Sequence, residues 1–317
     1  MWAIWCAHHL WFLLAVGFVI GRYGLEEAPT DAAPADARQL AGATAQHPVR
    51  GFLFTATSDG PSCKAFRVAV ESLQVAKCRS RFAKGEPNHC QIGFVGDMAS
   101  ALSAKKHCAS QFDVIKAVDT SECQQRAGTD LKGFNLCIRA LSLAPFDQNV
   151  LLDSETLVTH GDVDLIFPVF AEGFELTAAF GCCAKPSNGE HIDLLLQGWE
   201  MQTGIMGFTK SPAISKHAWK AIEIYERTVK QQRLSTGTQS AETLALGESQ
   251  VKFYLLPPNL NLRSSTTTGF WDLPFAVAHK KYNPATPLKD LLKSKPGHWW
   301  CHESGNAEEI GKCGSRR

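Results

Sequence analysis

An alternation of strand-like and helix-like segments is the feature that most restricts the fold of this chain. Four short apolar segments suit buried strands, and segments with apolar residues at helical spacing separate them. This order predicts an α/β fold with a mixed, mostly parallel sheet and helices on both of its faces. In such sheets ligands bind at the carboxyl ends of the strands, so the residues that follow the strands are the first site candidates. The strand-like segments are 51–57 (GFLFTAT), 90–98 (CQIGFVGDM), 112–119 (FDVIKAVD) and 149–152 (NVLL).

The helix expected before the fourth strand places Leu131, Phe134 and Ile138 on one face. Thr129 can cap this helix, and Pro145 marks its end. Beyond the fourth strand the pattern predicts further strands and two helices. The expected strands are 162–170 (DVDLIFPVF), 176–181 (LTAAFG), 198–208 (GWEMQTGIMGF), 251–258 (VKFYLLPP) and 275–282 (FAVAHKKY), and the expected helices are 211–233, with Ser211 as its cap and Pro212 in its first turn, and 240–248.

The fourth strand runs directly into two carboxylates, Asp153 and Glu155. Side chains two residues apart on an extended chain point the same way, so these two charges are expected to lie close together. A divalent cation between them would offset their repulsion. The pattern of two acidic residues one residue apart is a weak signal by itself. It occurs again at Asp162 and Asp164, where we expect a solvated turn ahead of an apolar run.

The N-terminal 24 residues contain no charged side chain before Arg22. Roughly 20 apolar residues are enough to cross a bilayer, so we expect 1–24 to be a transmembrane signal anchor. A cleaved signal peptide is the alternative, but it normally has a basic n-region, which is absent here. The stretch 25–48 is rich in Ala, Pro and acidic residues, a composition that is typical of a flexible stem. The folded domain is then expected over 49–300, followed by a C-terminal tail, 301–317.

The chain has 11 cysteines, of which ten follow the expected anchor. This even and dense set favours an oxidising compartment and some disulfides, with a pairing that the sequence does not reveal. We therefore expect a single-pass protein of the Golgi or ER membrane with a lumenal domain. The positive-inside rule alone would keep the flank that carries Arg22 in the cytosol. The formal net charge of +1 gives no field that would favour nucleic acid as a partner.

The segment PFDQNVLLDSETLVTHGDVDLIF, 145–167, carries a family resemblance. It resembles the core of GT-A glycosyltransferases of the glycogenin and galactinol synthase type and of plant and algal nucleotide-diphospho-sugar transferases. Their pattern is roughly (P)FDRVLYLDADTLVLGDVDELF. The similarity is dense from 145 to 262 and implies a Rossmann-like GT-A domain. Further similar pieces follow in the same order: EMQTGIMGFTKSPA (200–213), TQSAETLAL (238–246), VKFYLLPPNLNLR (251–263) and AVAHKKYN (276–283).

The resemblance implies transfer of a sugar from a nucleotide-diphosphate sugar, with a UDP-sugar as the expected donor, to a hydroxyl of a glycan, protein or polyol. It implies retention of the anomeric configuration. It also implies that Asp153, Glu155 and His279 hold Mn²⁺ or Mg²⁺, a set of oxygen ligands and one imidazole that suits Mn²⁺. The bound cation would stabilise charge on the leaving diphosphate.

Other site candidates come from the resemblance or from their position near the motif. Gln202 is the candidate for contact with the donor sugar or the reacting centre. Lys132 and Arg139 lie on the helix before the motif strand. We expect both to lie on a solvated face of this helix, and of the two we assign Lys132 to the donor. The remaining residues assigned to the donor nucleotide are Thr55, Ala56 and Thr57 after the first strand, Ser154 within the motif, and Lys280, beside Lys281, near the phosphates.

Two departures from the family pattern keep other functions open. Glu155 stands where the family usually has Asp, and Thr238 before Gln239 stands where it has an Asp-Gln pair. Glu242 lies close by and can substitute for the missing Asp. A lumenal binding protein that keeps the fold without turnover is therefore the main alternative. A nucleotidyltransferase is less favoured, because TATSDGPSC (55–63) does not supply the Gly-rich basic loop that this class needs.

Overall fold

The computed structural model describes one domain of the chain. The described residues are 48–58, 60–77, 91–127, 130–159, 161–181, 200–230, 238–257, 260, 262–263, 277–279 and 288–293. All of them belong to a compact unit that begins at Pro48. The expected anchor, nearly all of the expected stem and the expected tail lie outside them. Within the described residues, no helix combines the length and the apolar character needed to span a bilayer.

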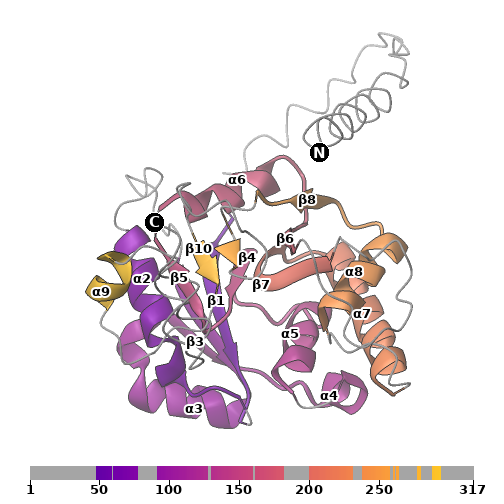
Figure 1. Cartoon of the computed structure of the whole chain (residues 1–317). Coiled ribbons are helices and arrows are strands. Elements are labelled where there is room, and N and C mark those ends of the chain that lie inside the picture. Colours follow the sequence, from indigo (N-terminus) through magenta and orange to yellow (C-terminus); the bar gives the residue numbers. More distant parts are fainter. Residues whose placement is uncertain are drawn as a thin grey trace, which may run out of the picture. The chain divides into compact units, whose positions relative to one another are not determined.

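A seven-stranded sheet forms the centre of this domain (Figure 1). Strands β3, β2, β1 and β4 run parallel to one another, as do β6 and β8. Within this sheet β7 is antiparallel to both of its neighbours, β4 and β6. The expectation of a mixed, mostly parallel sheet is therefore confirmed. In order across the sheet the strands are β3 (Val114–Ala117), β2 (Gln91–Gly96), β1 (Arg50–Ala56), β4 (Gln148–Leu152), β7 (Glu200–Thr209), β6 (Leu176–Gly181) and β8 (Phe253–Leu255).

Helices cover both faces of the sheet, as the sequence predicts (Figure 1). Alternate residues of β1 point to opposite faces, so Phe52 and Phe54 enter one core and Leu53 enters the other. The Phe52 core also contains residues of α2 (Arg67–Lys77), α3 (Met98–His107) and α6 (Ile166–Ala171). The Leu53 core contains residues of α5 (Leu131–Ala140) and α7 (Pro212–Lys230), and a third cluster packs α4 (Ser121–Ala127) and α8 (Thr238–Glu248) against these two helices.

A second, three-stranded sheet lies next to the turn that follows β4. Its strands are β5 (Thr156–Val158), β10 (Val277–His279) and β9 (Leu262–Arg263). Strand β10 pairs antiparallel with β5 and parallel with β9. The remaining short elements are the 3-10 helices η2 (Cys63–Phe66), η3 (Ala109–Gln111) and η4 (Gly161–Leu165) and the helix α9 (Leu288–Lys293).

The segment 162–170 is helical, so the strand predicted there is wrong. An apolar run without alternation suits a buried helix as well as a buried strand. Here α6 packs so tightly on β7 that a Cβ added at Gly207 would lie 2.9 Å from both Ile166 and Phe170. Asp164, in the 3-10 helix η4 just before α6, is only 1% exposed, so the predicted solvated turn is also wrong.

The N-cap of α5 is Asp130, one residue after the predicted cap Thr129. An Asp130 carboxylate oxygen accepts a 2.6 Å hydrogen bond from the Gly133 amide. Its other oxygen accepts a 2.9 Å hydrogen bond from the Tyr225 hydroxyl of α7. The start of α5 is thereby fixed to α7. The predicted Ser211 cap of α7 is confirmed, since the hydroxyl of Ser211 accepts the Ile214 amide at 3.2 Å.

Two disulfides confirm the expectation that some cysteines pair. Cys63 in η2 is bonded to Cys108 at the end of α3, and Cys123 in α4 is bonded to Cys137 in α5. The second bond closes a loop of 14 residues, which restricts the unfolded chain. It also holds α4 against α5, the helix that forms one wall of the site.

Candidate functional site

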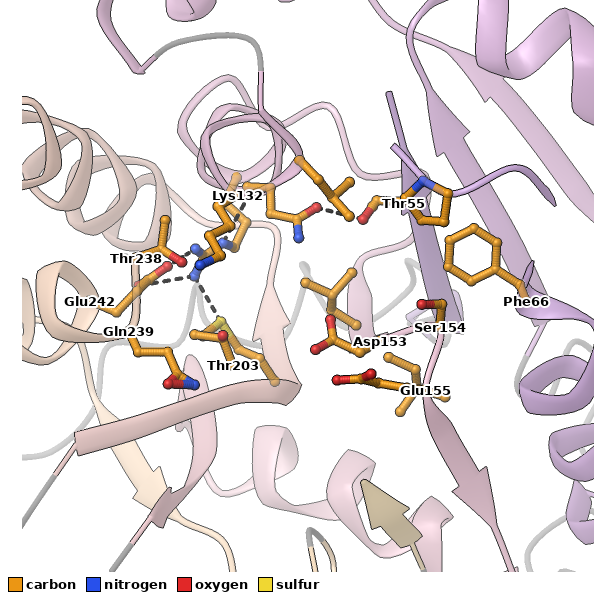
Figure 2. Close-up of a pocket in the computed structure, with 17 residues that line it drawn as sticks. Thr55, Phe66, Lys132, Asp153, Ser154, Glu155, Thr203, Thr238, Gln239 and Glu242 are labelled. Atoms are coloured by element: carbon orange, nitrogen blue, oxygen red, sulfur yellow. Dashed lines mark hydrogen bonds and ion pairs between the residues drawn. The ribbon is translucent and has the colours of Figure 1, made fainter. Parts of the chain in front are cut away.

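A cavity of about 550 Å³ lies where β1 and β4 end (Figure 2). Residues from β1, α5, β7, α8 and the turn after β4 line it. It brings together five residues that the sequence places in the site. These are Thr55, Lys132, Asp153, Ser154 and Glu155.

Hydrogen bonds to the backbone of Asp153 fix the turn that carries the two carboxylates. The Asp153 amide donates to the Gly204 carbonyl of β7 at 3.1 Å. The amide and hydroxyl of Thr156 both donate to the Asp153 carbonyl, at 3.2 Å and 2.8 Å. The chain therefore turns tightly between β4 and β5, and Figure 2 shows the carboxylates of Asp153 and Glu155 side by side, both directed into the cavity. Two hard oxygen donors arranged in this way suit Mg²⁺ or Mn²⁺.

The backbone of His279 lies close to these carboxylates in the second sheet. Its Cα is paired with that of Thr156, the residue after Glu155, in the antiparallel ladder of β5 and β10. The side chain of His279 lies outside what the structure describes, as do Lys280 and Lys281. Among the described residues there is no group of three or more His, Cys, Asp or Glu that could hold a metal ion. The third ligand therefore stays a prediction.

A bulge in β7 brings Thr203 to the cavity. The pairing of β7 with β6 jumps from Gln202 to Met206 while β6 advances by one residue. Bulges of this kind redirect side chains and are frequent beside active sites. Thr203 and Met206 line the cavity, whereas Gln202 is buried in the strand and does not. The sequence reasoning missed Thr203, although Gly204 inside a strand pattern is a signal for a bulge.

Of the three residues predicted at the end of β1, only Thr55 lines the cavity. Its hydroxyl donates a 2.5 Å hydrogen bond to the Asn135 side-chain oxygen on α5. Ala56 and Thr57 are buried next to it without lining the cavity. Asn135, which also lines the cavity, was missed by the sequence reasoning.

Three polar residues of α5 face the cavity because their spacing places them on one side of the helix. Lys132, Asn135 and Arg139 are separated by three and four residues, which is the spacing of one helical face. Lys132 is exposed, as expected. Arg139 is only 3% exposed, so the solvated position predicted for it is wrong.

Arg139 is buried because Glu242 of α8 pairs with it. Its terminal nitrogens donate to both carboxylate oxygens of Glu242, and one of them also donates to the Met206 sulfur at 2.8 Å. The guanidinium lies 5.8 Å from the centre of the Phe208 ring, within the range of a cation–π contact. The dashed lines in Figure 2 show this link between the two walls of the cavity.

Glu242 is engaged on a second side by His217 of α7. The Nε2 atom of His217 lies 2.9 Å from a carboxylate oxygen of Glu242, and its Nδ1 atom lies 2.9 Å from the Ser249 hydroxyl. Burial acts to raise the pKa of Glu242, but the charge of Arg139 and the hydrogen bond with His217 outweigh it and lower the pKa to about 2. Glu242 lines the cavity beside Thr238 and Gln239. Its carboxylate oxygens, however, are already bound by Arg139 and His217.

Comparison with known proteins gives structural likenesses only. No protein-family model matches the chain, and a search of curated proteins gives no significant match. Among solved structures, mouse xyloside xylosyltransferase 1 has a TM-score of 0.46 and 15% identity, with 75% of this chain and 100% of that chain covered. The galactosyltransferase LgtC, in complex with donor and acceptor sugar analogs, has a TM-score of 0.48 and 16% identity, over 84% of this chain and 95% of that one.

A third likeness is to the glycosyltransferase GlyE of Streptococcus pneumoniae. It has a TM-score of 0.49 and 15% identity, over 77% of this chain and 62% of that one. None of these three TM-scores reaches 0.5, so the functional argument rests on the residues of the cavity.

Proposed function

We propose that this chain is a metal-dependent glycosyltransferase that uses a nucleotide-diphosphate sugar, with a UDP-sugar as the donor. The observation that carries this proposal is the pair of carboxylates, Asp153 and Glu155, directed into a cavity where β1 and β4 end. Thr55 and Lys132 line the same cavity. The cavity therefore combines two carboxylate ligands for a cation, the ammonium group of Lys132 and the hydroxyl group of Thr55.

Each part has a defined task in the proposed reaction. A bound Mn²⁺ or Mg²⁺ supplies Lewis-acid stabilisation of the charge that develops on the leaving diphosphate. Asp153 and Glu155 hold the cation, and His279 is proposed as its third protein ligand. Lys132 has no ion-pair partner among the described residues, so its ammonium is available to a phosphate oxygen. Thr55 contributes a fixed hydroxyl at the end of β1.

The remaining parts of the proposal rest on the amino-acid sequence alone. The acceptor is a hydroxyl of a glycan, protein or polyol, and the anomeric configuration is retained. Gln202 is kept as the candidate near the reacting centre. Ala56, Thr57, Ser154 and Lys280 are kept as donor-site residues. The segment 1–24 anchors the chain in a Golgi or ER membrane, with the domain in the lumen.

A binding protein without turnover is the second candidate, and one observation favours it. Thr238 stands where the resembled family has Asp, and Glu242, which the sequence offered as a replacement, is bound by Arg139 and His217. No other carboxylate among the described lining residues is close in sequence to Thr238. A protein of this kind would bind the donor and release nothing.

The experiment uses the full chain in mild detergent with a panel of UDP-, GDP- and CMP-sugars, in Mn²⁺ or in EDTA. Released nucleotide is measured with and without a mixture of acceptors. We expect release from a UDP-sugar in Mn²⁺ and none in EDTA. Asp153→Asn should lower the rate roughly 100-fold or more, because a Lewis acid contributes several kcal/mol to such a step.

Glu172→Gln is the matched control, since Glu172 is an exposed carboxylate outside the cavity. This control should keep the wild-type rate. Metal-dependent binding of UDP without release from any donor would instead support the binding protein. Absence of both binding and release would overturn the proposed function.

A further inference from the structure

Arg139 is the most deeply buried cation at the wall of the cavity, and the proposed reaction gives it no task. A guanidinium has five N–H donors. Nε donates to the Asn135 carbonyl at 3.4 Å, one terminal nitrogen donates to Met206 and Glu242, and the other donates to Glu242. Within the described residues the fifth donor, on that second terminal nitrogen, has no partner. A buried donor without a partner costs free energy, so an acceptor oxygen in the cavity would be favoured there.

The charge of Arg139 is already compensated, which decides the kind of acceptor. Glu242 is 1% exposed, carries the opposite charge and forms an ion pair with Arg139. The pair therefore offers a directed N–H rather than a net positive charge. Lys132, seven residues earlier on the same helical face, is exposed and has no such partner among the described ion pairs. Lys132 is therefore the better partner for a charged phosphate, and Arg139 is the better partner for a neutral hydroxyl.

We propose that Arg139 determines the sugar specificity of the cavity by donating its remaining N–H to a hydroxyl oxygen of the transferred sugar. This inference rests on the proposed function. Glu242 is a positioning residue, because its two oxygens hold the planar guanidinium in one orientation. The Nε2 atom of His217 lies 2.9 Å from the Oε2 atom of Glu242 and helps to hold this carboxylate in place. A site built to hydrogen-bond a hydroxyl discriminates strongly against sugars that lack it or direct it elsewhere.

Two variants separate a specificity role from a structural one. Arg139→Lys keeps a positive charge opposite Glu242 but loses the planar fork. The double variant Arg139→Met with Glu242→Leu removes both buried charges together, which is often tolerated when removal of one alone is not. Glu242→Gln tests the positioning role, because it leaves Arg139 present but less firmly oriented. Urea denaturation of each full-length variant shows whether it is folded under the binding conditions.

The readout is the dissociation constant of UDP and of UDP-glucose, UDP-galactose and UDP-xylose, measured by calorimetry in Mn²⁺. The wild type should prefer one of these sugars over the others. In all three variants UDP should bind as in the wild type, while the preferred UDP-sugar should bind about tenfold more weakly, the typical value of one hydrogen bond. The preference among sugars should shrink accordingly.

Three results would overturn this assignment. An equal loss of affinity for UDP and for the UDP-sugars would place Arg139 against the diphosphate. Unchanged affinity for every ligand in the folded double variant would make the pair purely structural. A wild type that binds neither UDP nor any UDP-sugar would refute the proposed function, and the assignment of Arg139 would fall with it.

Discussion

Replacement of the buried carboxylate by an amide, Glu242→Gln, gives the sharpest test of the charge network. The substitution keeps the size of the side chain and removes its charge. Arg139 then stays charged, because a guanidinium does not deprotonate in proteins, and it is left buried without a counter-charge. Removal of one partner of a buried ion pair is strongly destabilising.

The size and pH dependence of this loss follow from the pKa of Glu242. Its lowering from 4.5 to about 2 corresponds to about 3 kcal/mol of stability at neutral pH. Because the folded-state pKa is depressed, this stability is fully present above the unfolded pKa of 4.5 and is lost as the pH falls toward 2. Gln does not titrate, so the difference between wild type and variant should shrink over that same window.

Urea denaturation of the full-length wild type and variant measures this difference at several pH values between 7 and 3. We expect a gap of about 3 kcal/mol at pH 7 that narrows steadily below pH 4.5. Glu248→Gln is the matched control, since Glu248 lies on the same helix but is exposed, and it should change stability far less. A gap that is absent at pH 7, or that stays constant down to pH 3, would refute the reasoning.

Three further predictions concern the parts that hold the cavity in shape, each measured by urea denaturation. Replacing Cys123 and Cys137 by Ser should cost about 3 kcal/mol, the loop-closure value for a crosslink of this length, and an unchanged midpoint would show that the bond does not constrain the unfolded chain. Asp130→Ala should cost about 1–2 kcal/mol through loss of the α5 cap, whereas an equally stable variant would mean that the cap contributes nothing. Thr55→Val, which keeps the shape of the side chain, should cost about 1 kcal/mol because the bond to Asn135 is lost; wild-type stability would contradict that bond.

The sheet could be predicted from the sequence because its signals are local. Each of the strands β1, β2 and β4 is an apolar run followed by polar or turn-forming residues, and these runs keep their strand identity in the fold. The same reasoning failed at 162–170, where an apolar run without alternation forms η4 and α6. Periodicity carries no information for a segment that is apolar on every side, so packing against β7 decides its conformation.

Site residues were predictable where their position follows from neighbouring residues in the sequence. They were unpredictable where their position depends on partners that are distant in the sequence. Asp153, Ser154 and Glu155 directly follow a strand, so their position at its carboxyl end could be derived. Arg139 was expected in solvent because a charged residue on a helix usually is. Its burial depends on Glu242, which is 103 residues away in the sequence, and no local pattern reveals that pairing.

The resolved role of Glu242 changes how the missing Asp at Thr238 is understood. A carboxylate with a pKa of about 2 is a poor base near neutral pH, because an effective general base has a pKa close to the working pH. Its oxygens are also occupied by Arg139 and His217, so an attack on a sugar carbon would require the ion pair to break. Glu242 is therefore better explained as the residue that orients Arg139 than as a replacement for the Asp. Under the proposed function, Asp153 and Glu155 would hold the cation that stabilises charge on the leaving diphosphate, and Arg139 would select the sugar.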